Sequence, residues 1–240
     1  MQIINREKIE ILRTKNITPE GVLILIKKPK DWTSFDVVKK IRTFFKWKKV
    51  GHSGTLDPKA EGLMILAINN MTKQIKNYSE LEKEYIGKMI LGARTPSYDA
   101  ETEISETADY SNISREDIKR VFLQYKGNIT QLPPMYSAVK YRGKPLYKYA
   151  RKGKKLNLTE RNVTIDELEL LEFKPPEVKF RVICSKGTYI RSLVNDIGNS
   201  LGCGAYLLEL VRTRIGTFKL EDAITIEELT KQIDIVDAVN

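Results

Sequence analysis

A short segment at residues 51–58, Gly-His-Ser-Gly-Thr-Leu-Asp-Pro, concentrates the residues best suited to chemistry. It holds the only histidine of the chain, His52, together with Asp57 and two glycines. Glycines let a loop bring its backbone close to a ligand, and a carboxylate can act as a nucleophile. Local sequence also fits two structural alternatives, because an aspartate before Pro58 is a common turn residue and His52 can serve as a structural histidine.

Metal and nucleotide cofactors lack their usual sequence signals. One histidine and two widely spaced cysteines, Cys184 and Cys203, do not form the common ligand sets for zinc. No glycine-rich phosphate-binding motif is present either. We therefore expect chemistry from side chains alone, with no metal and no cofactor, and two free core thiols rather than a disulfide.

The charge balance indicates a polyanionic partner. Lys and Arg number 41 against 31 Asp and Glu, which gives a net charge of +10 and a pI near 9.4. Residues 39–49 and residues 136–155 contain no acid and interleave basic residues with aromatic ones. Cations that follow phosphates beside rings that stack on bases suit RNA, whereas the alternative is a solvated face beside core aromatics.

The apolar stretches are far shorter than the roughly 20 residues of a membrane-spanning helix. Residues 1–19 show no leader pattern of a basic start, an apolar run and a small-residue cleavage site. We therefore expect no membrane association and a cytoplasmic location.

The elements that must position this loop mix strands and helices without regular alternation. We expect strands at residues 21–27, 63–68, 84–91, 162–173 and 178–185. We expect helices at residues 115–125 and 189–201, and another capped by Ser34 and Asp36 that runs through Val37, Val38, Ile41 and Phe45. This pattern predicts an α+β fold with a mixed, mainly antiparallel sheet flanked by helices and loops. It also predicts a single domain over residues 1–240, with its core from about residue 20 and a basic excursion at residues 128–155.

Residues 49–63 resemble the signature Gly-His-x-Gly-x-Leu-Asp-Pro-x-Ala-x-Gly of the TruB family of tRNA pseudouridine synthases. Further blocks of the family pattern follow the same order. They are Lys28-Pro29 with Trp32-Thr33-Ser34, residues 131–140, residues 184–191 and residues 201–205. The resemblance covers the chain from about residue 21 onward.

The resemblance implies the pseudouridine synthase fold and isomerisation of uridine to pseudouridine at position 55 in the T-stem loop of tRNA. It implies no metal or cofactor, and we expect a monomer. A uridine inside a folded loop must be flipped out before a side chain can reach it, and basic and stacking contacts offset that cost.

The resemblance also assigns roles to individual residues. Asp57 matches the catalytic aspartate, and Arg191 matches the arginine expected to hold it ionised. Tyr85 matches a tyrosine that stacks on the flipped base and assists proton transfer. Substrate contacts are expected from the remaining matches: His52, Lys28, Tyr189, Leu210 and Asp99.

Two departures from the family pattern concern RNA binding. Residues 92–102 lack one acid and the closing glycine of the pattern, although Asp99 keeps its position. We also expect no full C-terminal RNA-binding domain of the PUA type, so that binding depends more on the excursion.

Two other functions stay open at this point. A tRNA chaperone without catalysis would use the same basic surface, and an N-glycosidase would use Asp57 to release the base. The sequence also leaves open whether Asp57 attacks the base, attacks the sugar or promotes elimination to a glycal.

Overall fold

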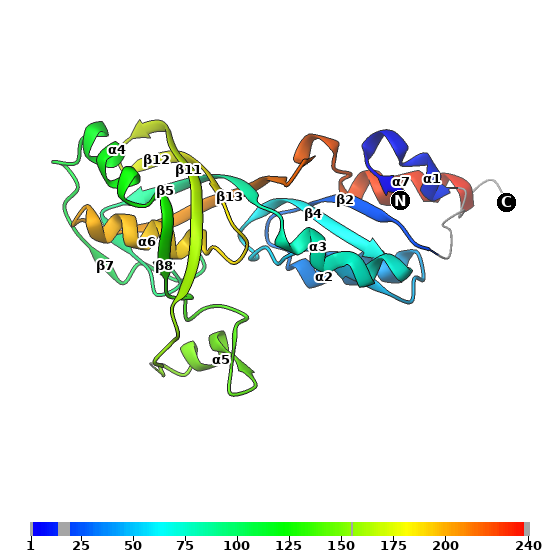
Figure 1. Ribbon diagram of the computed structural model, residues 1–240, viewed down its shortest axis with the longest axis horizontal. Coiled ribbons are helices and arrows are strands. Elements are labelled where there is room, and N and C mark those ends of the chain that lie inside the picture. The colour runs from blue at the N-terminus through cyan, green and yellow to red at the C-terminus, as the bar shows by residue number, and fades with distance from the viewer. Residues whose placement is uncertain (1, 14–19, 155, 238–240) are drawn as a thin grey trace. The chain divides into compact units, whose positions relative to one another are not determined.

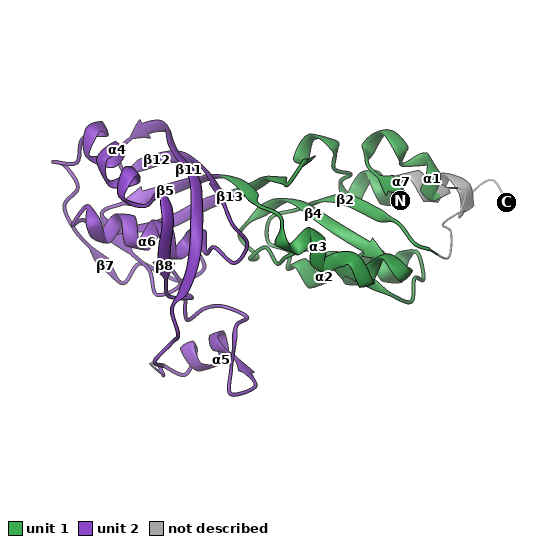
Figure 2. Ribbon diagram, viewed as in Figure 1, with its two compact units in different colours: residues 1–85, 211–240 green, residues 86–210 purple. Residues whose placement is uncertain are grey.

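The computed structural model describes residues 2–13, 20–154 and 156–237. The chain divides into two compact units, coloured separately in Figure 2. Unit 1 comprises residues 1–85 and 211–240, and unit 2 comprises residues 86–210. Strands β5 (Lys83–Leu91) and β13 (Ala205–Ile215) each contribute residues to both units.

Unit 1 is built around a mixed sheet whose central strands are β2 (Leu23–Lys28), β4 (Glu61–Ile68) and the second half of β13. Strand β2 pairs antiparallel with β4, and β4 pairs parallel with β13 through Arg212 opposite Gly62. The other elements of this unit are β1 (Ile3–Ile4), η1 (Arg6–Lys8), α1 (Glu10–Arg13), α2 (Ser34–Phe44), β3 (Val50–His52), η2 (Asn69–Gln74), α3 (Ile75–Glu80), β14 (Phe218–Lys219), η3 (Leu220–Asp222) and α7 (Ile226–Asp237). Apolar residues of β2, β4 and β13, including Leu25, Leu63 and Ile215, form its buried core.

Helix α2 forms where the apolar spacing predicted it, and it buries Val37, Val38 and Ile41. Its start differs by one residue from the expectation. Thr33 is the N-cap and forms a reciprocal capping box with Asp36, whereas Ser34 is the first helical residue. The Ser34 hydroxyl does not cap the helix because it binds the backbone of Leu56.

Unit 2 carries strands in the order β13, β5, β12 (Glu177–Cys184), β11 (Arg161–Lys174) and β8 (Gly127–Gln131). The pairings of β11 with β12 and with β8 are antiparallel. The remaining elements of unit 2 are β6 (Ala93–Arg94), β7 (Glu106–Thr107), α4 (Arg115–Gln124), β9 (Lys140–Tyr141), β10 (Lys144–Pro145), α5 (Leu146–Ala150) and α6 (Ile190–Ser200). The expected α+β class with a mixed, mainly antiparallel sheet is confirmed.

The basic segment between β8 and β11 leaves the sheet of unit 2 and returns to it. It contains the short hairpin of β9 and β10 followed by α5, and Figure 1 shows it projecting from the ends of β8 and β11. The flanking strands are joined by the pairing of Arg161 with Gln131. A single pair of strand ends therefore fixes both ends of the excursion.

Most predicted elements are confirmed to within a few residues, and several were not predicted, among them β13, β8 and α7. Cys184 and Cys203 are both buried, as expected of core thiols. Among the residues that the structure describes, no helix has both the length and the apolar character required to cross a membrane.

Candidate active site

The loop between β3 and β4 carries Asp57 and is fixed on both sides of it. The Leu56 amide donates to the Ser34 hydroxyl at 2.8 Å, and that hydroxyl lies 3.1 Å from the Leu56 carbonyl. On the other side, the Pro58 carbonyl accepts from the Asp31 amide at 2.8 Å and from Lys28 Nζ at 3.3 Å. Asp57 thus lies between two anchored residues, which restricts where its carboxylate can move.

Lys28 is fully buried at the end of β2. Its ammonium donates to the carbonyls of Pro29 at 2.8 Å, Trp32 at 2.5 Å and Pro58 at 3.3 Å. Burial lowers the pKa of Lys28 to about 8, and the negative charge of Asp57 partly opposes that shift. These bonds make Lys28 a support of the loop, and the substrate contact expected of it stays a prediction.

Arg212 is a second buried cation behind the same loop, and the sequence reasoning missed it. It is 1% exposed, and it donates from Nε to the Leu63 carbonyl at 2.7 Å and from Nη2 to the Gly54 carbonyl at 3.3 Å. Gly62 allows its approach, since a Cβ there would lie 2.4 Å from the Arg212 carbonyl oxygen. The glycine spacing of the signature was the available signal, because a glycine within a strand often marks a close backbone approach.

His52 ends β3 and presents a neutral imidazole. The Gly54 amide donates to its Nδ1 at 3.3 Å, so that nitrogen is an acceptor and the proton sits on Nε2. Burial lowers the pKa of His52, and the positive charge of Arg212 lowers it further. The imidazole therefore acts as a hydrogen-bonding group at neutral pH.

In unit 2, Arg191 is held from three directions near the start of α6. Its Nη1 donates to the carbonyls of Ser97 at 3.1 Å and Tyr136 at 3.0 Å, and its Nε lies 3.4 Å from Asp99 Oδ2. The Arg191 side chain is only 3% exposed. A fork with several fixed donors suits arginine and not lysine.

Asp99 is buried and its carboxylate is engaged within unit 2. Its Oδ1 accepts from the Ser97 hydroxyl at 2.6 Å and from the Glu101 amide at 2.9 Å, while Oδ2 faces Arg191. Tyr98, with a φ of 64°, makes the turn that aims Asp99 inward. The structure thus gives Asp99 a place beside Arg191, and the RNA contact expected of it stays a prediction.

Three further predicted residues lie on β5, on β13 and at the start of α6. Tyr85 on β5 and Leu210 on β13 are each 8% exposed, and Tyr189 is the N-cap of α6. The amide side chain of Gln131 binds both backbone groups of Tyr189, a contact that the sequence did not predict.

The structure therefore brings the predicted residues into two sets. Lys28, His52, Asp57 and Tyr85 belong to unit 1, and Asp99, Tyr189, Arg191 and Leu210 belong to unit 2. Lys28 and Asp57 are near enough for their charges to interact, and Arg191 and Asp99 form a buried ion pair. The expected pairing of Asp57 with Arg191 stays a prediction.

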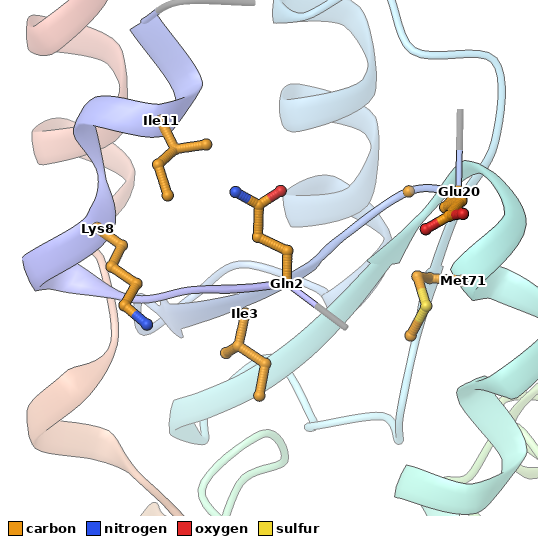
Figure 3. A pocket seen from close by; sticks show the side chains of 7 residues that line it. Gln2, Ile3, Lys8, Ile11, Glu20 and Met71 are labelled. Carbon is orange, nitrogen blue, oxygen red and sulfur yellow. The ribbon is translucent and has the colours of Figure 1, made fainter. Parts of the chain in front are cut away.

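A pocket of about 410 Å³ lies in unit 1 (Figure 3). Its lining includes Gln2, Ile3, Lys8, Glu20 and Met71. None of the predicted site residues lines this pocket, so it is separate from the candidate active site.

Comparison with known proteins agrees with the loop signature. The model of the TruB family pseudouridylate synthase N-terminal domain matches residues 42–190, and that of the tRNA pseudouridylate synthase B C-terminal domain matches residues 191–238. The tRNA pseudouridine synthase B of Phocaeicola vulgatus is 46% identical over 221 residues, which cover 90% of this chain and 94% of that protein. The protein of the same name from Chloroherpeton thalassium is 43% identical over 226 residues, covering 92% and 94%.

A solved structure, that of a Cbf5-Nop10-Gar1 complex, contains a chain with 32% sequence identity and a TM-score of 0.70. The match covers 95% of this chain and 58% of that one, so this chain spans less than two thirds of its length. The family models together cover most of the sequence, and the relatives match over nearly their whole length. The chain belongs to the TruB family of pseudouridylate synthases.

Proposed function

We propose that this protein isomerises uridine to pseudouridine in tRNA, at position 55 of the T-stem loop. The observation that carries the proposal is Asp57, held between anchored residues in a loop with the family signature. Relatives named tRNA pseudouridine synthase B support tRNA as the substrate. A tRNA substrate also favours the cytoplasm as the place of action, and we propose that both units of a monomer serve this one activity.

The reaction breaks the bond between C1′ and N1 and forms a bond between C1′ and C5. The proton on C5 leaves and N1 gains one, so that the product has the composition of the substrate. An ionised Asp57 supplies the nucleophile or stabilises the intermediate. The buried cation of Lys28 attracts that negative charge within unit 1.

The other site residues have supporting roles in this proposal. Tyr85 stacks on the flipped base and assists removal of the C5 proton, and Arg191 stabilises the carboxylate. Asp99 holds the Arg191 guanidinium in place through the ion pair described above. His52, Tyr189 and Leu210 contact the extruded nucleotide.

Two exposed basic surfaces supply the RNA-binding energy. Along α2, the side chains of Lys39, Lys40 and Arg42 are exposed, and just beyond it Phe45 stacks on Trp47 with centroids 4.2 Å apart. In the excursion, Arg142 lies over Tyr141 and Arg151 lies over Tyr147, each 5.5 Å from the ring centroid. Guanidinium groups on rings offer both a charge for phosphates and a flat face for bases.

The test is tritium release from a T-stem-loop RNA labelled at uridine C5, compared between wild type and Asp57→Asn. We expect wild type to release the label and Asp57→Asn to bind the RNA with similar affinity but release none. Binding without release by wild type would indicate a chaperone, and free uracil would indicate an N-glycosidase. Either result would overturn the proposed function.

A further inference from the structure

Gln131, the last residue of β8, binds the backbone of Tyr189 with both ends of its amide. Its Nε2 donates to the Tyr189 carbonyl at 3.3 Å, and its Oε1 accepts from the Tyr189 amide at 3.0 Å. The Gln131 side chain is 2% exposed, so water is not available to replace either bond.

This contact serves as an N-terminal cap of α6. Tyr189 is the N-cap of α6 and its own side chain makes no capping hydrogen bond. In a capping box, the side chain three positions on accepts from the N-cap amide. Here that position is Ser192, whose hydroxyl instead donates to the Leu132 carbonyl at 2.8 Å. Gln131 therefore takes over the acceptor role from a distant strand.

The first turn of α6 is in this way tied to the start of the excursion. Three of its residues bond to three positions that lie close together in the sequence. Tyr189 bonds to Gln131, Ser192 to Leu132, and Arg191 to Tyr136 through the 3.0 Å contact of its Nη1. Gln131 is therefore bonded to the same helical turn that carries Arg191.

We propose that Gln131 is a positioning residue for the isomerisation, which fixes the first turn of α6 so that Tyr189 and Arg191 meet the substrate in register. The inference rests on the proposed function. Glutamine is required because the Tyr189 backbone needs one donor and one acceptor in the same plane. Glutamate lacks the donor, and methionine of similar size lacks both.

The experiment measures the single-turnover rate of tritium release and the dissociation constant for the same RNA in wild type, Gln131→Met and Val163→Ala. Val163 is a buried residue of β11 that pairs with β8, and its truncation destabilises the same sheet while leaving the hydrogen bonds of Gln131 to Tyr189 in place. We expect Gln131→Met to lower the rate by about 10-fold to 100-fold, because a misplaced catalytic group costs that much. The dissociation constant should stay unchanged, since the RNA-binding surfaces remain.

Val163→Ala should lower the midpoint of thermal unfolding at least as much as Gln131→Met and keep the wild-type rate. Gln131→Glu, which keeps the acceptor for the Tyr189 amide, should have a rate between those of wild type and Gln131→Met. Should Gln131→Met not fold, Gln131→Glu and Ser192→Ala carry the test, and their combined loss should be smaller than the product of the two single losses.

An unchanged rate in both Gln131 variants would overturn the inference while the proposed function stands. Equal rate losses in Val163→Ala and Gln131→Met would also overturn it, since they would reveal a general loss of stability. A wild-type protein that releases no tritium would overturn the proposed function itself.

Discussion

At the scale of single residues, the predicted catalytic carboxylate depends on neighbours that hold the backbone of its loop. Ser34, Lys28 and Arg212 each bind a backbone carbonyl of the loop that carries Asp57. Two of these are cations with no exposed charge, which is costly unless their donors are satisfied. Backbone carbonyls accept from both cations, and the bonds to Pro58 and Gly54 among them also fix the loop.

Replacing Arg191 by lysine should remove most of the activity. A single ammonium cannot span the carbonyls of Ser97 and Tyr136 and the carboxylate of Asp99, which the guanidinium contacts together. We expect the single-turnover rate of Arg191→Lys to fall by about 100-fold. Arg181→Lys, at a partly exposed ion pair with Glu169 on the sheet of unit 2, is the matched control and should keep the wild-type rate. Near-normal turnover by Arg191→Lys would refute the role given to the fork.

His52 should make folding stability depend on pH. Its pKa is lowered in the folded protein, so below its ordinary pKa near 6.5 the unfolded chain binds a proton that the folded chain does not. The free energy of unfolding should therefore fall as the pH drops below about 6.5 and be fully retained above it. Urea unfolding at pH 7.5 and 5.5 measures the effect, and His52→Gln should reduce the difference. Equal pH dependence in wild type and His52→Gln would contradict the assignment.

At the scale of elements, Gly198 inside α6 packs closely against the backbone of Gly204 and Ala205, which follow the helix. A Cβ at Gly198 would lie 2.1 Å from the Ala205 amide nitrogen and 2.5 Å from the Gly204 carbonyl carbon. Alanine is normally favoured over glycine in a helix by up to about 1 kcal/mol. At position 198 the clash should instead make alanine less stable than glycine.

Gly198→Ala should therefore lower the free energy of unfolding by about 1–3 kcal/mol, as expected for overpacking. Ser200→Ala, at an exposed position of the same helix, serves as the control and should change it little. Chemical denaturation of both variants gives the comparison. A stabilised Gly198→Ala would show that β13 can move away from α6 without cost.

The elements that the sequence predicted are those whose pattern is local. Helix α2 follows from its apolar spacing, and β4 follows from a continuous apolar run. Strand β13 was not predicted, because the apolar residues around Leu207 and Leu210 fit either period. The burial of Arg212 was not predicted, because a basic residue in a strand is normally expected on the surface.

In the candidate site, too, local sequence patterns predict some features and miss others. The signature picked out Asp57 and His52, and the block at residues 184–191 picked out Arg191, but the partners of all three depend on tertiary contacts. The bonds of Lys28 to the loop and of Gln131 to Tyr189 join positions 30 and 58 residues apart. No local pattern encodes such contacts, so only the structure gives them.

At the scale of the whole molecule, the excess of 10 positive charges should make RNA affinity depend on salt. Each phosphate that a cation neutralises adds about 0.7 to 0.9 to the slope of log affinity against log salt. Replacing Lys39 and Lys40 together by glutamine should therefore lower the slope by about 1 to 2. Lys174→Gln with Lys219→Gln removes the same charge from exposed ion pairs and should leave the slope unchanged. Equal slopes in the two double variants would exclude α2 as an RNA surface.

The pairing of Gly62 with Arg212 has a consequence for how the chain is made. The ribosome delivers β4 about 150 residues before the strand that covers its edge, and every residue of unit 2 emerges in between. During that interval unit 1 lacks the guanidinium that fastens Gly54. Released chains that end before residue 205 should leave the Asp57 loop unprotected from proteases, while those that extend past residue 220 should resist cleavage there.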